Sequence, residues 1–470
     1  MKFLTRIILL VFIISGVLQN CYRLDPAFAF SVGDEKEVGE ELMTMVRKEF
    51  RLLDEPDILQ YINRLGQSTL EVAGPQYFDY HFFVINNKEL NAFAAPSGLI
   101  FFHSGLIESL ENEGELVGVV AHEIGHVVSR HLAHRMSKSA KISAATMLGV
   151  LVGIAIGGGP LSEALIAGSA AAGQSAALSF SRLDEEEADR LAFKWMQDQK
   201  RDPSVMVDML RKIHTMNRYR QGYVPPYLLT HPNPDIRMSY IQDLMLFSEK
   251  KPFIKFDEFP FQRFKSRVIS LTRDPMLLIQ KYETALESMK PDSQEAAMAH
   301  FILSQAYLAA AEYDKAESEL RQTTSSYPDK TILKADLGVI FLKAGRYQMA
   351  LSQLQEADKN NRNDAYSTFY LALALEKTGK LEEAALLYEK LLARIPSYSQ
   401  LYYQLANLKG KLDEKGEGFY YYGYYYWYEG DLDSAKYHYS KAIALLPQDS
   451  RMRAEAQNML KKIARIEKKE

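Results

Sequence analysis

Apolar residues follow two different spacings along the chain, and each spacing predicts a different kind of element. Over residues 33–70 they recur every three or four positions between charged residues, which predicts helix. Two short apolar and aromatic runs follow, at 80–85 and 91–103, and these predict strands. Pro96 and Gly98 interrupt the second run, so we expect an edge strand or a bulge there. An extended substrate peptide can add to such an edge by main-chain hydrogen bonds, although an ordinary edge strand explains the pattern equally well.

Helical spacing returns at 106–110 and again at 115–136, where we expect one long helix. The next stretch, 142–162, has 21 residues without a charge and is rich in Gly and Ala. A membrane-inserted hairpin is one interpretation, but the run GGGP at 157–160 interrupts it, and few large apolar residues fill its second half. We therefore expect residues 142–178 to form a flexible or membrane-touching flap, with a membrane-embedded segment as the alternative.

The C-terminal part of the chain repeats itself every 34 residues. Ala316, Ala350 and Ala384 are spaced by this period, and the last unit follows 51 residues later, which is one period plus 17 residues. The pattern over residues 295–450 resembles the tetratricopeptide family, whose helix pairs stack into a solenoid with a concave peptide-binding face. The extra 17 residues depart from the spacing of that family and leave the shape of the concave face open.

These elements predict a mainly α chain, and its 470 residues are too many for one domain. We expect an α+β domain with a small edge-stranded sheet over residues 30–250, and an α-helical tetratricopeptide solenoid over 291–450. Residues 251–290 begin with a basic, proline-bearing stretch and are predicted to form a linker and a lead-in helix. Residues 451–470 are predicted to form a charged C-terminal helix or tail.

Composition and the N-terminus restrict the partners and the compartment. The chain has 56 Lys and Arg against 60 Asp and Glu without a basic block, so we expect no nucleic-acid partner. Residues 1–29 are typical of a secretory signal, because two cations precede an apolar run too short to span a bilayer and Ala27 and Ala29 form a small-x-small cleavage site. Cleavage after Ala29 would remove Cys21, the only cysteine, and would exclude disulfides and a thiol nucleophile. We expect the protein in the periplasm; the alternatives are anchoring through a lipidated Cys21 and peripheral membrane association.

Residues 122–126 read HEIGH, which is the spacing of a zinc-protease helix. On a helix, His122 and His126 lie one turn apart on the same face, so both imidazoles can bind one Zn²⁺ per chain. Glu123 lies beside them, where its carboxylate can act on the water that the metal polarises. A catalytic zinc site usually needs a third protein ligand, which this motif does not contain.

Several residues compete for the role of third ligand. The metzincin pattern fails, because Ser129 and Leu132 occupy the positions of its glycine and its third histidine. His131 and His134 are too far from the first pair on a continuous helix, and we expect them to be solvated or structural.

The acidic run SRLDEEEAD at 181–189 is the better source of the third ligand. Charge runs are usually solvated helix faces, but Glu185 and Asp189 share one face and Ala188 permits close approach to Gly125. Spacing gives Glu185 a modest advantage over its neighbours. Asp189, one turn later, can accept a hydrogen bond from a ligand imidazole and fix its tautomer.

The ordered segments NAFAAPSG, HEIGH, SRLDEEEAD and THPNPDIR resemble the HtpX and CAAX-prenyl-protease type of zinc metallopeptidase. One departure is Ser97, where that family more often has glycine. The resemblance implies zinc on His122, His126 and Glu185, Glu123 as catalytic base, Asp189 as the support of a ligand, His231 near the metal, and Arg237 neutralising charge there. His231 would either occupy the open position in a resting enzyme or stabilise the oxyanion during turnover.

These observations predict a zinc metalloendopeptidase whose repeats hold a substrate or a partner. The resemblance implies work in the bacterial cell envelope on unfolded or misassembled proteins, outer-membrane proteins in particular, with the outer-membrane assembly machinery as a candidate partner of the repeats. The alternative is a periplasmic chaperone or assembly scaffold in which His231 plugs the protease site. The aromatic run YYYGYYYWY at 420–428 would supply packing core from about half of its rings and an exposed client-binding surface from the rest.

Overall fold

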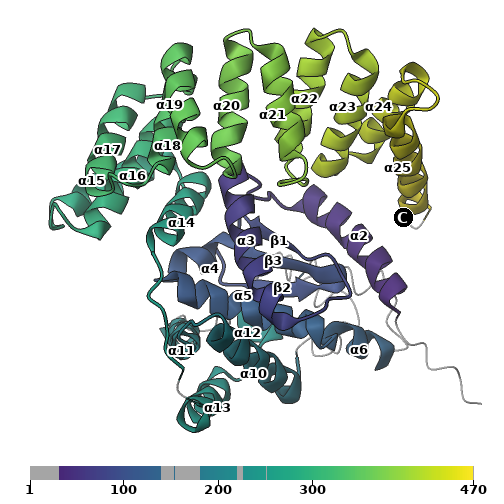
Figure 1. Ribbon diagram of the computed structural model, residues 1–470. Helices are drawn as coiled ribbons and strands as arrows, with labels where there is room; N and C mark the ends of the chain where they lie inside the picture. Colours follow the sequence, from purple (N-terminus) through teal and green to yellow (C-terminus); the bar gives the residue numbers. More distant parts are fainter. Residues whose placement is uncertain (1–30, 139–152, 154–179, 220–225, 250, 469–470) are drawn as a thin grey trace, which may run out of the picture.

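The computed structural model describes residues 31–138, 153, 180–219, 226–249 and 251–468. The predicted signal at 1–29 and, apart from Gly153 and Phe180, the segment 139–180 lie outside the described residues. The mainly α architecture is confirmed: the described helices surround one small sheet in the N-terminal part and form an arc of stacked helices in the C-terminal part (Figure 1). None of the described helices is both long enough and apolar enough to cross a membrane.

The predicted helical stretch at 33–70 is two helices, α2 (Val32–Glu49) and α3 (Pro56–Ala73). Pro56 is the first residue of α3, where its missing N–H costs nothing and its fixed φ suits a helix start. The residue before a proline is biased away from helical geometry, so the chain is extended between the two helices. Leu52 in this link pairs with Ile85 of the sheet.

The predicted strand at 91–103 is a hairpin rather than one interrupted strand. It comprises β2 (Ala92–Ala95), a short 3₁₀ turn η1 (Pro96–Gly98) and β3 (Leu99–His103), and β2 and β3 pair antiparallel. Ser97 and Gly98 have φ angles of 70° and 77°, and these left-handed conformations reverse the chain. The first strand, β1 (His81–Ile85), runs parallel to β3, so the order is β1-β3-β2 and β2 lies at an edge.

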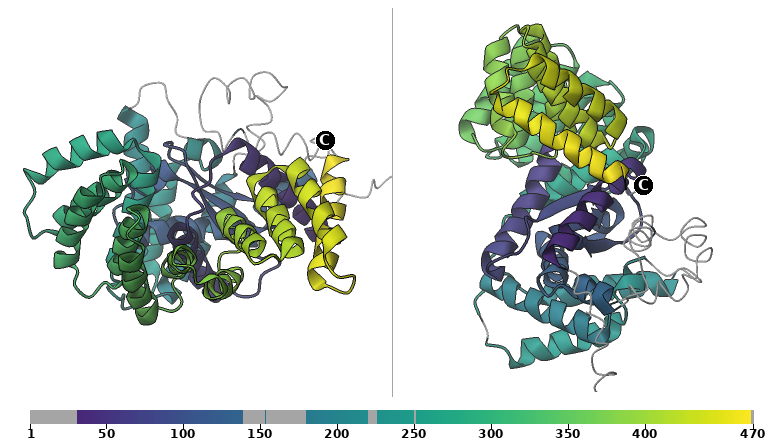
Figure 2. Two further views of the ribbon diagram at one scale, coloured as in Figure 1. Left: turned by 90° about the horizontal axis from the view of Figure 1, so that it is seen from above. Right: turned by 90° about the vertical axis from the view of Figure 1, so that its right-hand side faces the viewer.

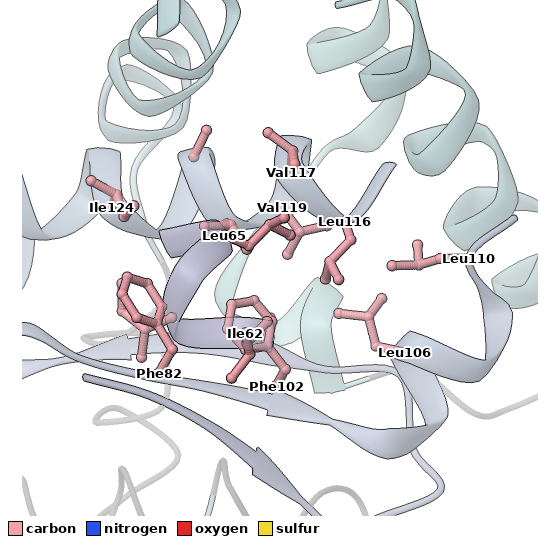
Figure 3. Packing of buried hydrophobic residues seen from close by; sticks show 14 of the residues in the cluster. Ile62, Leu65, Phe82, Phe102, Leu106, Leu110, Leu116, Val117, Val119 and Ile124 are labelled. Carbon is pink, nitrogen blue, oxygen red and sulfur yellow. The ribbon is translucent and has the colours of Figure 1, made fainter. Parts of the chain in front are cut away.

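Alternate side chains of the sheet enter two separate apolar clusters. Phe83, Phe93 and Phe101 face α2, whereas Phe82 and Phe102 face α3 and α5. Figure 3 shows the second cluster, in which side chains of α3, the sheet, α4 (Ser104–Ser109) and α5 (Glu113–Val128) meet: Ile62, Leu65, Phe82, Phe102, Leu106, Leu110, Leu116, Val117, Val119 and Ile124. A methyl group on Gly66 would lie 2.1 Å from the Phe82 ring, so this close packing requires glycine.

The helix predicted over 115–136 breaks in the structure. α5 ends at Val128, Ser129 caps it, and α6 (His131–Lys138) begins after Arg130, whose φ is 51°. The remaining described helices of the N-terminal part are α10 (Arg182–Asp198), α11 (Ser204–Tyr219), α12 (Pro226–Thr230) and α13 (Pro234–Phe247).

The C-terminal arc consists of paired helices, and Figure 2 shows them stacked side by side from two further directions. They are α15 (Pro275–Leu286), α16 (Gln294–Ala309), α17 (Tyr313–Ser326), α18 (Ile332–Lys343), α19 (Tyr347–Asn360), α20 (Ala365–Lys377), α21 (Leu381–Leu391), α22 (Ser399–Lys411), α23 (Lys415–Glu429), α24 (Leu432–Leu445) and α25 (Arg451–Glu467). One helix, α20, lies between α19 and α21, but two, α22 and α23, lie between α21 and α24. The extra 17 residues, half of the 34-residue period, are therefore one additional helix.

Helix α14 (Phe259–Thr272) joins the two parts. Its Phe261, Phe264 and Val268 belong to the cluster of the N-terminal part, and its Phe259 and Ile269 belong to the cluster of the first repeat helices. The domain boundaries predicted from the sequence, with 251–290 as linker and lead-in helix, stay a prediction.

The aromatic run at 420–428 lies on α23 and contradicts one expectation. Tyr420 and Tyr421 are buried, and the other aromatic rings of the run are half-buried; none is exposed. They pack against α22 and α24, for example Tyr402 on Tyr424 and Tyr439 on Tyr424. The expectation that about half of the rings form an exposed client-binding surface is wrong, because α22 and α24 pack against α23 from both sides.

Candidate metal centre

Two helices carry the predicted ligands, and they approach each other closely at a glycine. A methyl group on Gly125 of α5 would lie 3.1 Å from both the Cα and the carbonyl oxygen of Ala188 on α10. Small residues at this crossing allow the motif helix and the acidic helix to share one buried site. A capping box between Ser181 and Asp184 fixes the start of α10, and Glu185 directly follows Asp184.

Four side chains bring metal-binding atoms together from three places in the fold. One such atom from each of His122, His126, Glu185 and His231 lies within 4.8 Å of the others, and all four residues are buried. The two motif histidines place their Nε2 atoms 3.0 Å apart. The carboxylate of Glu185 lies 3.5 Å from each of these nitrogens. Glu185, rather than Glu186 or Glu187, is thus the member of the acidic run that meets the imidazole pair.

Asp189 contacts the Nδ1 side of His122, and the Nε2 of the same ring lies near the other ligand atoms. Its Oδ1 lies 2.7 Å from His122 Nδ1, so that nitrogen can donate its proton to the carboxylate and Nε2 is left with its lone pair. Arg237 donates to both oxygens of Asp189, each at 2.8 Å, and its Nη1 lies 2.9 Å from Glu185 Oε2. Tyr240 also donates its hydroxyl proton to Asp189. Burial alone would raise the pKa of Asp189, but Arg237 and His122 lower it well below its usual range, so the group is a carboxylate.

His231 lies directly against the ligand atoms. Its Nδ1 is 3.0 Å from Glu185 Oε1 and 3.3 Å from His122 Nε2, and its Nε2 is 3.5 Å from Glu123 Oε1. Tyr227 stacks on the imidazole with ring centroids 4.5 Å apart, and no part of His231 is exposed. Burial opposes its protonation, but the carboxylates of Glu185 and Glu123 raise the pKa of His231 above its ordinary value.

The charges and the donor set of this centre fit a divalent metal ion. Glu123, Glu185 and Asp189 are three buried carboxylates, and Arg237 is the one Arg or Lys side chain among the described residues that pairs with them. With His231 neutral, two negative charges are left over, which a divalent ion would neutralise. Both oxygens of Glu123 are buried without a hydrogen-bond partner among the described residues. Two imidazoles and one carboxylate are also the protein ligands of a common type of catalytic zinc site.

Sequence reasoning missed the role of the helix break after α5. Because the chain turns at Arg130, His131 folds back and places its Nδ1 2.9 Å from His126 Nδ1. His131 is buried, whereas His134 is exposed. His131 is therefore structural rather than solvated: it contacts the ring of His126 but lies outside the group of four ligand atoms. Nothing in the residue types of Ser129 and Arg130 indicates a left-handed turn, and the five-residue step from His126 to His131 is visible only in retrospect.

Comparisons with known proteins identify the two parts of the chain separately. Residues 55–245 match the family model of peptidase family M48, and residues 335–399 match a tetratricopeptide repeat. The β-barrel assembly-enhancing protease of Escherichia coli (strain K12) is 28% identical over 357 residues, which cover 76% of this chain and 72% of that protein. A protein of the same name from Yersinia pestis is 36% identical over 211 residues, 44% of this chain and 43% of that protein. A mitochondrial metalloendopeptidase, OMA1 of Schizosaccharomyces pombe, is 26% identical over 217 residues, 45% of this chain and 61% of that protein.

Proposed function

We propose that this chain is a metallopeptidase that uses one Zn²⁺ per chain to cleave unfolded or misassembled proteins of the bacterial cell envelope. The match of residues 55–245 to peptidase family M48 and of residues 335–399 to a tetratricopeptide repeat supports the proposal. The observation that carries the proposal is the convergence of His122, His126 and Glu185 at one buried point beside Glu123. A structural ion pair would not need Glu123, a further buried carboxyl group whose two oxygens have no hydrogen-bond partner among the described residues.

His122, His126 and Glu185 would hold the metal, which when bound supplies polarisation of the scissile carbonyl and of the attacking water. Glu123 would take the proton of that water on a carboxylate oxygen and later deliver it to the leaving amine. Asp189 would fix the His122 tautomer that presents Nε2 to the metal. Arg237 would keep Asp189 and Glu185 ionised, because it pairs with both carboxylates.

We propose that His231 occupies the fourth ligand position in a resting enzyme. Its Nδ1 lies 3.0 Å from Glu185 Oε1, which is a hydrogen-bond distance. One ring nitrogen of His231 also lies within 4.8 Å of the ligand atoms of His122, His126 and Glu185. A catalytic zinc site needs this position for water or substrate, so the side chain would have to leave before turnover. The rival role, stabilising the oxyanion, would require His231 to lie beside the metal position without binding it.

The proposed location and clients follow from the N-terminus, the repeats and the relatives. Residues 1–29 have the pattern of a secretory signal, which supports export to the periplasm, and anchoring at Cys21 stays the alternative. Tetratricopeptide repeats bind other proteins, and relatives of this chain are named β-barrel assembly-enhancing proteases. Unfolded outer-membrane proteins are therefore the proposed substrates, and the outer-membrane assembly machinery is a proposed partner of the repeats. Membrane contact through 142–178 concerns residues outside those described and stays a prediction.

The edge strand β2 is the proposed place for the substrate backbone. It contacts α5, the helix that carries His122 and His126, and its outer side has no strand partner among the described residues. An extended peptide added to β2 would run past the metal centre with its main chain fixed by hydrogen bonds.

The test uses the exported chain without residues 1–29 and an unfolded outer-membrane protein as substrate. Glu123→Gln should keep the metal content and lower cleavage by about 10²–10⁴-fold, because the base and the acid are lost together. Glu186→Gln on α10 is the control, since Glu186 pairs with Arg190 at the surface and not with the metal centre. Undiminished cleavage by Glu123→Gln would refute the assignment. If Glu123→Gln supports envelope assembly in cells as well as the natural chain does, the result would favour the chaperone alternative over the protease.

A further inference from the structure

We propose that His131 is a positioning residue for the metal ligand His126. Nδ1 of His131 would accept a hydrogen bond from the Nδ1–H group of His126. Nε2 of His131 would donate to the carboxylates at the start of α10, so that both imidazoles are held in place. This inference rests on the proposed function, because it concerns how the proposed metal site is held. None of the sequence patterns assigned a role to His131.

With a metal on His126, only one arrangement of protons satisfies the hydrogen-bonded path from His126 through His131 to the carboxylates. If the metal takes His126 Nε2, the remaining proton of that neutral ring is on Nδ1, 2.9 Å from His131 Nδ1. His131 Nδ1 must then be the acceptor, which puts the His131 proton on Nε2. That nitrogen faces Glu187 Oε2 at 3.3 Å and Asp184 Oδ1 at 4.0 Å. Every donor along the path therefore faces an acceptor.

The two metal-binding histidines are thus held in different ways. His122 donates to a carboxylate, Asp189, whereas His126 would donate to a neutral imidazole whose own partner is a carboxylate. The second arrangement leaves the anionic groups, Glu187 and Asp184, at a partly exposed position. A fourth buried carboxylate beside His126 would exceed the charge that a divalent ion and Arg237 neutralise.

The surrounding structure fixes His131 from both ends. Arg130, which makes the left-handed turn, is paired with Glu35 of α2, and Glu35 is only 4% exposed. On the other side, Ser129 Oγ donates to Glu187 Oε1 at 2.9 Å, and Arg135 pairs with Asp184 at 2.7 Å. Phe180 stacks on His126 with ring centroids 3.8 Å apart and closes the remaining face of that imidazole. These contacts together fix the orientation of the His126 ring.

The test is metal affinity, which does not depend on turnover. The dissociation constant for Zn²⁺ is measured by competition with a chelator for the natural chain, His131→Leu, His131→Asn and His134→Leu. His131→Leu fills the buried space with an apolar side chain that has no hydrogen-bond acceptor. We expect this variant to bind Zn²⁺ about 10–100-fold more weakly. His131→Asn should recover most of the affinity, because its Oδ1 can take the place of Nδ1 as acceptor. His134→Leu is the control, since His134 lies on the same helix and is exposed.

The outcomes separate the inference from the proposed function. Natural affinity in His131→Leu, with tight binding by the unchanged chain, would overturn the positioning role and leave the metallopeptidase intact. Equal weakening in His131→Leu and His131→Asn, with helix content and unfolding midpoint of both metal-free variants unchanged, would show that packing rather than the acceptor matters, and would also overturn it. If the unchanged chain binds no Zn²⁺, the proposed metal fails, and the inference fails with it.

Discussion

Replacing Arg263 should weaken the connection between the peptidase part and the repeats more than any surface substitution. Arg263 lies on α14 and donates to Asp336 of α18 through Nε at 3.0 Å and Nη2 at 2.6 Å. Its Nη1 donates to Asp57 of α3 at 3.0 Å. Asp336 is fully buried, and Arg263 is 6% exposed. One side chain thus joins three helices from the two parts of the molecule.

The loss of stability in Arg263→Met depends on which cationic partners Asp57 and Asp336 still have after the substitution. Asp57 retains Arg267, whose Nε lies 2.9 Å from its Oδ2. Asp336 keeps no cation among the described residues, because Arg263 is the only one paired with it. Breaking a buried ion pair by removing one partner costs about 3–5 kcal/mol, since the other charge is left uncompensated. Removing both charges in Arg263→Met with Asp336→Leu should recover most of that loss.

Native-state hydrogen exchange of the α14 and α18 amides measures the loss of stability at these two helices. A local measurement is preferable to a single unfolding midpoint, because the peptidase part and the repeats can unfold separately. Arg346→Met is the control, because Arg346 makes ion pairs with Asp314 and Glu317 at the surface of the repeats and should matter little. The metal content of Arg263→Met should not change, because Arg263 makes no contact with the metal centre. Exchange as slow in Arg263→Met as in Arg346→Met would refute the role given to the buried network.

Two further predictions concern the metal centre. His231→Ala should raise cleavage of an unfolded client, because the substitution empties the proposed fourth ligand position; a lower rate in the same assay would assign His231 to oxyanion stabilisation instead. Asp189→Asn should weaken Zn²⁺ binding by about 10–100-fold in chelator competition, because the amide cannot pair with Arg237 as a carboxylate does and holds His122 less firmly. Unchanged affinity in Asp189→Asn would contradict its supporting role.

The sequence predicted the regular elements well and the chain reversals poorly. Helical and strand spacing located the motif helix, the strands and the repeats, because those patterns reflect burial on one face. The hairpin at Ser97 and the break at Arg130 depend on left-handed backbone conformations, which serine and arginine do not favour and which tertiary packing imposes. Pro56 was a visible helix start inside the predicted helical stretch, and reading it would have separated α2 from α3.

The candidate site was predictable where its residues belong to local motifs. His122, Glu123 and His126 are fixed by helical spacing, and the structure brings Glu185, Asp189, His231 and Arg237 to the same point. Tyr227, Tyr240 and His131 were missed, because their contacts depend on how α12, α13 and α6 pack against the motif helix. Roles for all of these residues stay predictions until they are measured.

The metal content of the purified chain, measured by elemental analysis beside Glu185→Ala, tests the central claim most directly. Of the three ligands proposed to hold the metal during turnover, Glu185 is the one outside the five-residue motif, and its carboxylate lies 3.5 Å from Nε2 of both motif histidines. We predict one zinc per chain in the unchanged protein and strongly reduced zinc in Glu185→Ala. A purified chain without zinc, or equal zinc in both proteins, would contradict the account.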